Sequence, residues 1–156
     1  MASTRREQIT MDADEVDEYL ARQRILNVAT IGPTGHPHLV AMWYVVRDGQ
    51  PTFWTFAKSQ KVVNIRRDPR VSALVESGDS YGELKGVELR GTARLVEDPA
   101  DVLDIGKAVG VKYTGAAAVS ADALPFLEAQ AAKRVGVAIE IAHVTSWDHT
   151  KLAGGY

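Results

Sequence analysis

The sharpest cluster of residues capable of chemistry is the run Lys58-Ser59-Gln60-Lys61, which stands between a strand-like and a helix-like segment. Ser59 occupies the position expected for the N-cap of the helix. Backbone N–H groups and the positive end of the helix dipole point outward at such a position, and the two lysines add formal charge. The pattern predicts a phosphate site. The competing interpretation is a solvated basic helix end that balances nearby acidic residues.

A second group consists of aromatic residues on an expected β-hairpin that runs directly into this basic helix end. Its members are Trp43, Tyr44, Phe53, Trp54 and Phe56. Partner strands of a hairpin bring such rings together, and flat heterocycles bind well against them. Each single ring also fits an ordinary barrel core. The juxtaposition of rings and basic helix end favours a ligand with an aromatic head and a phosphorylated tail.

The sequence lacks the residues that several other kinds of chemistry require. The chain has no cysteine, which excludes disulfides, thiolate metal sites and a cysteine nucleophile. The pair His36 and His38 has no nearby carboxylate to complete a metal site, so no metal is expected. The sequence contains no G-x-S-x-G nucleophile elbow, no G-x-G-x-x-G fingerprint and no P-loop.

The elements that must position these residues alternate between strand and helix patterns. Asp12 and Glu15 have the spacing of a capping box at the start of a helix. Both faces of the run Pro37–Val46 are apolar, so both faces need cover, from the barrel interior on one side and from a helix, ligand or second subunit on the other. The expected strands are Ile25–Ile31, Pro37–Val46, Pro51–Phe56, Val71–Glu76, Tyr81–Val96 and Val135–Val144, and the expected helices are Asp12–Gln23, Ser59–Asp68, Pro99–Val109 and Asp122–Arg134.

About six strands with short connections favour antiparallel pairing. We therefore expect residues 1–156 to form a single domain of the mainly β, α+β class, a six-stranded antiparallel split β-barrel with peripheral helices. Residues 1–10 are expected to be flexible and residues 99–134 to form a helical insert. The net charge of −2 gives no case for nucleic acid, and the longest apolar run, Leu39–Val46, is far shorter than the ~20 residues of a membrane span. A cytoplasmic location is expected.

The order and spacing of three motifs resemble the pyridoxamine-phosphate-oxidase-like split-barrel family over roughly Asp12 to Leu152. The motifs are Gly32-Pro33-x-Gly35-x-Pro37 with Val40-Ala41-Met42-Trp43-Tyr44, then Phe53-Trp54-Thr55-Phe56-Ala57-Lys58-Ser59-x-Lys61-x-x-Asn64-x-x-x-Asp68-Pro69-x-Val71, then Ser146-Trp147-Asp148-His149-x-Lys151-Leu152. The chain is most similar to the actinobacterial flavin/deazaflavin oxidoreductases that use coenzyme F420. It lacks the terminal Arg/His motif of the pyridoxamine-phosphate oxidases proper, so their substrate is not expected.

The resemblance implies an FMN-binding split barrel that forms a homodimer, with two cofactor sites at the subunit interface. By position in the family motif, the strand Val40, Ala41, Met42 and Trp43 would run along the tricyclic ring of the cofactor. The ring edge and the phosphate would contact Thr55, Phe56, Ala57, Lys58 and Ser59, with Lys61 and Asn64 continuing the anion site. Trp147 would come from the other subunit. No catalytic residue is assigned.

The resemblance also implies an activity. The expected enzyme is an F420-dependent oxidoreductase that transfers a hydride from reduced deazaflavin to a conjugated small-molecule acceptor: an enone, a quinone-like compound or a tetrapyrrole. Two lysines at a phosphate site do not indicate which of the two cofactors, FMN or the deazaflavin, is bound. An FMN-dependent oxidoreductase of the same fold therefore stays open, as does a non-catalytic binder of a cofactor or haem.

Overall fold

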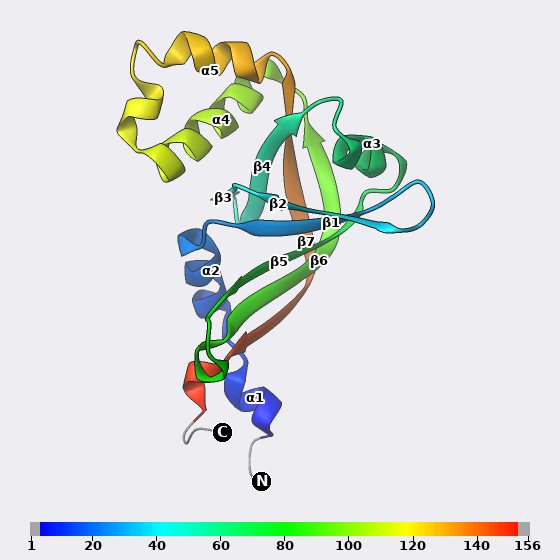
Figure 1. The fold of residues 1–156 in the computed structure, drawn as a ribbon, viewed down its shortest axis with the longest axis vertical. Coiled ribbons are helices and arrows are strands. Elements are labelled where there is room, and N and C mark those ends of the chain that lie inside the picture. Colours follow the sequence, from blue (N-terminus) through cyan, green and yellow to red (C-terminus); the bar gives the residue numbers. More distant parts are fainter. Residues whose placement is uncertain (1–3, 153–156) are drawn as a thin grey trace.

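The computed structural model describes residues 4–152, and its seven strands form one antiparallel sheet. The sheet has the order β2-β1-β5-β6-β7-β4-β3 (Figure 1). The strands are β1 (Leu26–Ile31), β2 (Pro37–Met42), β3 (Val45–Arg47), β4 (Gln50–Phe56), β5 (Arg70–Ser77), β6 (Lys85–Val96) and β7 (Arg134–Asp148). The expected antiparallel half-barrel with peripheral helices is confirmed.

Five helices accompany the sheet in this part of the chain: α1 (Arg5–Ile9), α2 (Ala13–Arg22), α3 (Gln60–Arg67), α4 (Pro99–Thr114) and α5 (Leu124–Ala131). The predicted capping box is present, because the Asp12 carboxylate accepts from the Glu15 N–H while the Glu15 carboxylate accepts from the Asp12 N–H. The Asp98 carboxylate caps α4 by accepting from the N–H groups of Ala100 and Asp101, with Pro99 at the first position of the helix. None of these helices combines the length and the apolar character needed to cross a bilayer.

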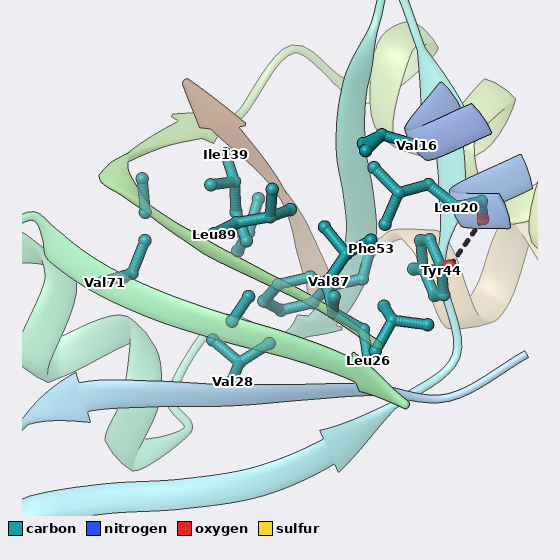
Figure 2. Close-up of a cluster of buried hydrophobic side chains, with 14 of the residues drawn as sticks. Val16, Leu20, Leu26, Val28, Tyr44, Phe53, Val71, Val87, Leu89 and Ile139 are labelled. Atoms are coloured by element: carbon teal, nitrogen blue, oxygen red, sulfur yellow. Dashed lines mark hydrogen bonds between the residues drawn. The ribbon is translucent and has the colours of Figure 1, made fainter. Parts of the chain in front are cut away.

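The main core lies on the concave face of the sheet, where alternate residues of each strand point inward. Leu26, Val28, Val87 and Leu89 are almost completely buried there, and Figure 2 shows them converging with Phe53. Helix α2 closes one end of this core with Val16 and Leu20. The Tyr44 hydroxyl donates to the Leu20 carbonyl oxygen at 2.5 Å, so the helix is tied to the sheet by a buried hydrogen bond as well as by packing.

A second, smaller core lies where the helical insert covers the other face of β4. Trp54 points outward from β4 and packs with Val102 and Ile105 of α4 and Leu127 of α5. Gly106 permits this contact, since a Cβ there would stand 2.5 Å from the Trp54 ring. Helices α4 and α5 both lie within the segment 99–134 that was expected to be a helical insert, whereas Arg134 already belongs to β7, and the insert forms the arm at the upper left of Figure 1.

The expected six strands are seven, because the run predicted as one strand, Pro37–Val46, breaks at Trp43 and Tyr44. Strand β2 pairs with β1 at one edge of the sheet, whereas β3 pairs with β4 at the opposite edge. The chain must leave the first ladder to reach the second, and these two residues make the crossing. The five aromatic residues consequently do not lie on one hairpin.

Near each end of the described chain the structure goes beyond the expected elements. Arg5–Ile9 forms a helix with its own capping box between Thr4 and Glu7, within the segment 1–10 whose expected flexibility stays a prediction; residues 1–3 lie outside the described part. The last strand was expected to end at Val144, which was wrong, because it continues to Asp148. It does so because β6 pairs with β7 along its whole length, from Lys85 opposite Asp148 onward, with a register shift at Arg90.

Candidate functional site

Strand β4 brings Thr55 to the N-terminus of α3, where three of the predicted site residues meet. The Lys61 ammonium donates to the Thr55 hydroxyl at 3.0 Å, and the Thr55 and Ser59 hydroxyl oxygens lie 3.5 Å apart. Thr55 is buried, while Ser59 and Lys61 are half-buried. We call Thr55, Ser59 and Lys61 the anion cluster. It provides an ammonium and two hydroxyls at the positive end of a helix dipole.

Ser59 holds the N-cap position of α3, as the sequence predicted, but its side chain does not cap the helix. Its carbonyl oxygen accepts from the N–H groups of Val62 and Val63 at 3.0 and 3.2 Å. The Ser59 hydroxyl makes no capping hydrogen bond, so the first backbone N–H groups of α3 are not satisfied by it. This helix end therefore keeps donors for an external acceptor.

The charged ammonium of Lys61 lies in a partly buried position. Burial lowers the pKa of its ammonium below the ordinary value of 10.5. Within residues 4–152 no carboxylate forms an ion pair with Lys61, and its Thr55 partner is neutral. An anion would supply the missing countercharge, so this donor set fits the phosphate of a nucleotide-like cofactor. The neighbouring Lys58 is exposed at the same turn.

Asn64 lies one turn further along α3 and is completely buried. Its amide nitrogen donates to the Thr30 hydroxyl of β1 at 2.9 Å, and its amide oxygen accepts from Gln60 at 2.8 Å. These bonds give Asn64 a positioning role, because they fix α3 against β1. Its predicted role as a direct anion ligand stays a prediction.

Phe56 and Ala57 complete the turn between β4 and α3. Phe56 points to the face of β4 opposite Thr55, and more than half of its side chain is exposed. The Ala57 N–H donates to the Lys133 carbonyl oxygen at 3.0 Å, which fixes the turn to the start of β7. Contact of these two residues with a cofactor stays a prediction.

Sequence reasoning missed Arg134, which stands beside this turn. Its guanidinium carbon lies 4.5 Å from the ring centre of Trp54 and 4.6 Å from that of Phe56. Burial lowers its pKa, and its buried Nε has no hydrogen-bond partner among residues 4–152. The i, i+2 spacing of the two rings was visible in the sequence, but the register that sets Arg134 opposite Phe56 was not.

The residues predicted to flank the cofactor ring lie on edge strand β2 and just beyond it. Val40 and Met42 are half-buried toward the core, whereas Ala41 is exposed on the other face. Trp43 follows the end of β2 and stacks on Tyr113 of α4, with ring centres 4.5 Å apart and planes inclined by 14°. The structure therefore places these four residues along one edge, apart from the anion cluster.

Trp147 lies far from the anion cluster of its own chain. Thr55 pairs with Val135 near the start of β7, whereas Trp147 pairs with Gly86 near its end. At about 3.3 Å per residue these two places on β7 are ~40 Å apart. The described chain does not itself bring Trp147 to the anion cluster. The expectation that Trp147 comes from a second chain stays a prediction.

No group of three or more His, Asp or Glu side chains that could hold a metal ion occurs among residues 4–152.

Residues 13–148 match the family model described as pyridoxamine 5'-phosphate oxidase. The chain belongs to this family. Among curated proteins, none matches the sequence significantly.

Solved structures of this pyridoxamine 5'-phosphate oxidase fold include similar chains. The conserved hypothetical protein Rv2991 from Mycobacterium tuberculosis is 43% identical, with 98% of each chain covered and a TM-score of 0.88. A protein described as an F420 reductase is 25% identical over 82% of this chain and 94% of its own, with a TM-score of 0.64. A FAD-binding protein from Mesorhizobium loti shares the fold at 23% identity, with 88% and 94% covered and a TM-score of 0.67.

Proposed function

We propose that this member of the pyridoxamine 5'-phosphate oxidase family is an F420-dependent oxidoreductase that acts on a conjugated small-molecule acceptor, such as an enone, a quinone-like compound or a tetrapyrrole. The observation that carries the proposal is the half-buried Lys61 ammonium, bonded to Thr55 and without an acidic partner in the described chain. The likeness to an F420 reductase over most of that protein's length supports it.

The residues of this chain would bind and orient the cofactor. The anion cluster holds the cofactor phosphate, and Asn64 fixes the helix that carries Ser59 and Lys61. The edge residues Val40 to Trp43 flank its ring. When bound, the deazaflavin supplies the hydride, and the protein contributes orientation and exclusion of water. No protein acid is required, because solvent can deliver the proton.

The same proposal requires a homodimer. Leu39 on β2 is 66% exposed, and Phe56 and Val144 also present large apolar side chains to solvent. Apolar surface of this kind is covered in a stable assembly. A second chain is also the only source from which Trp147 could reach the anion cluster, given its position on β7.

Titration of the purified protein with F420 and, separately, with FMN tests the proposal. We expect F420 to bind more tightly, and Lys61→Ala to weaken binding by ~1.5–3 kcal/mol, the usual value of a charge-assisted hydrogen bond. Lys107→Ala is the matched control, because Lys107 lies on α4 and pairs with Asp104 at 3.5 Å. Tighter binding of FMN would favour the flavin enzyme of the same fold. Unchanged affinity in Lys61→Ala would overturn the site.

A further inference from the structure

Three flat groups are stacked where the last turn of α4 meets the break between β2 and β3. The Trp43 indole lies parallel to the Tyr113 ring at 4.5 Å, and the guanidinium carbon of Arg24 lies 4.7 Å from the centre of the same ring. Since the indole covers one face of Tyr113, the guanidinium occupies the other. We call Arg24, Tyr113 and Trp43 the aromatic stack. Its indole end is 51% exposed.

Hydrogen bonds hold the central ring of the aromatic stack in place. The Tyr113 hydroxyl accepts from the Tyr44 N–H at 2.9 Å and has two acceptors for its proton, the carbonyl oxygens of Arg24 at 2.7 Å and of Tyr44 at 2.8 Å. The Arg24 guanidinium in turn donates to the Tyr113 carbonyl oxygen at 3.2 Å. The stack is therefore preorganised, and the indole loses little freedom when a second flat group covers it.

Positive charge surrounds the aromatic stack. The Lys112 ammonium lies 4.2 Å from the Tyr44 ring centre and has no hydrogen-bond partner in the structure. Within residues 4–152, neither Lys112 nor Arg24 forms an ion pair with a carboxylate. A ligand that brings negative charge or carbonyl oxygens is favoured beside two such cations.

We infer that the exposed face of Trp43 is a stacking platform for a planar conjugated ligand that bears carbonyl or anionic oxygens, with Tyr113 as its positioning residue. The inference rests on the proposed function only in identifying this ligand with the acceptor. The platform is separate from the anion cluster. Asn64 reaches Thr30, which pairs with His38, and β2 then runs about 13 Å to Met42 before Trp43.

The test measures binding of 1,4-naphthoquinone-2-sulfonate, a planar anionic dicarbonyl probe, to the cofactor-free full-length protein by calorimetry. The chain has no cysteine, so the quinone meets no thiol to which it could add. We expect Trp43→Leu to weaken binding about two- to tenfold, the range that one aromatic stacking contact produces. Trp43→Phe keeps a flat ring and should bind within about threefold of the parent.

Matched variants separate stacking, positioning and charge. Tyr113→Leu removes the support of the indole and should weaken the probe as Trp43→Leu does, whereas Tyr113→Phe retains the ring. Phe126→Leu removes an exposed ring on α5 outside the stack and should change nothing. Arg24→Gln should weaken the anionic probe more than neutral menadione. Thermal unfolding of every variant checks that it folds. If Tyr113→Leu does not fold, the result for Trp43→Leu alone tests the platform.

Parent-like affinity in Trp43→Leu, or no binding of the probe to the parent at millimolar concentration, overturns the platform. A change of sedimentation from dimer to monomer in Trp43→Leu also overturns it, because a second chain would then cover the indole. Lys61→Ala separates this inference from the proposed function. It should weaken cofactor binding as stated above and leave the probe's affinity unchanged, and unchanged cofactor affinity in that variant defeats the proposed function alone.

Discussion

At the scale of single residues, the candidate site contains polar and charged groups whose burial lowers the free energy of unfolding. Lys61 keeps an ammonium in a partly buried position where, within the described part of the chain, its hydrogen-bond partner is the neutral Thr55 hydroxyl. A side chain selected for stability alone would be apolar there. The residue is better explained by an anion that is bound during function than by the packing of α3.

The pH dependence of stability should expose this cost. The pKa of Lys61 is lower in the folded chain than the ordinary 10.5, so the unfolded chain binds more protons between the two values. Stability therefore rises with pH in that window. We expect the melting temperature of wild type, relative to that of Lys61→Met, to rise from pH 7 to 10.5. Lys107→Met, which removes a lysine that is paired with Asp104, should show no comparable gain.

Tyr44 shows the opposite kind of residue, one whose polar group serves the fold. It is completely buried, and its hydroxyl satisfies the Leu20 carbonyl in the last turn of α2 (Figure 2). Burial raises the pKa of Tyr44 far above its ordinary value, so the hydroxyl stays a donor at every physiological pH. We expect Tyr44→Phe to lower the free energy of unfolding by about 1–3 kcal/mol in urea titrations, because it strands that carbonyl.

At the scale of elements, the sequence signals that predicted helix starts correctly were local ones. The Asp12–Glu15 capping box and the Ser59 N-cap position fixed two helix starts. The break at Trp43 and Tyr44 was not visible locally, because it depends on which sheet edge each half joins and on the Tyr113 hydroxyl, about seventy residues away, that replaces the lost ladder bonds. The extension of β7 to Asp148 likewise follows from pairing with β6.

The exit of α3 into β5 offers a pH test of one such local signal. Arg70 donates to the Asp68 carboxylate from its backbone and its guanidinium, which lowers the pKa of Asp68 from 3.8 to about 2. The stabilisation is complete above pH 3.8 and is lost as the pH falls through about 2. The urea midpoint of Asp68→Asn should therefore lie slightly below that of wild type at pH 7 and converge with it near pH 2.

Asp79→Asn is the control for the Asp68 experiment, since Asp79 is exposed in the loop after β5. Its midpoint should follow that of wild type throughout the titration. A gap between Asp68→Asn and wild type that persists unchanged to pH 2 would contradict the assignment to this carboxylate. The effect is expected to be small, because Asp68 and Arg70 meet at the surface.

At the scale of the whole molecule, the fold separates the two ends of its longest strand pair. The anion cluster lies by the start of β7, and Trp147 lies near the end of the same strand. The predicted site includes residues from both places, so the proposed function requires two chains. No local motif contains this separation, because the distance depends on the pairing of β6 with β7 along the whole of β6, with one register shift at Arg90.

A mixing experiment tests whether two chains share a site. Lys61→Ala and Trp147→Ala should each bind F420 poorly as pure homodimers. After the two are unfolded together and refolded in equal amounts, half of the dimers are mixed, and each mixed dimer has one site with both native side chains. The binding capacity should therefore recover to about a quarter of all sites in a two-fold symmetric dimer. Trp147→Phe, which keeps a ring against Gly86, serves as a folding control. If both residues acted within one chain, mixing would restore nothing, because every chain would still carry one defect.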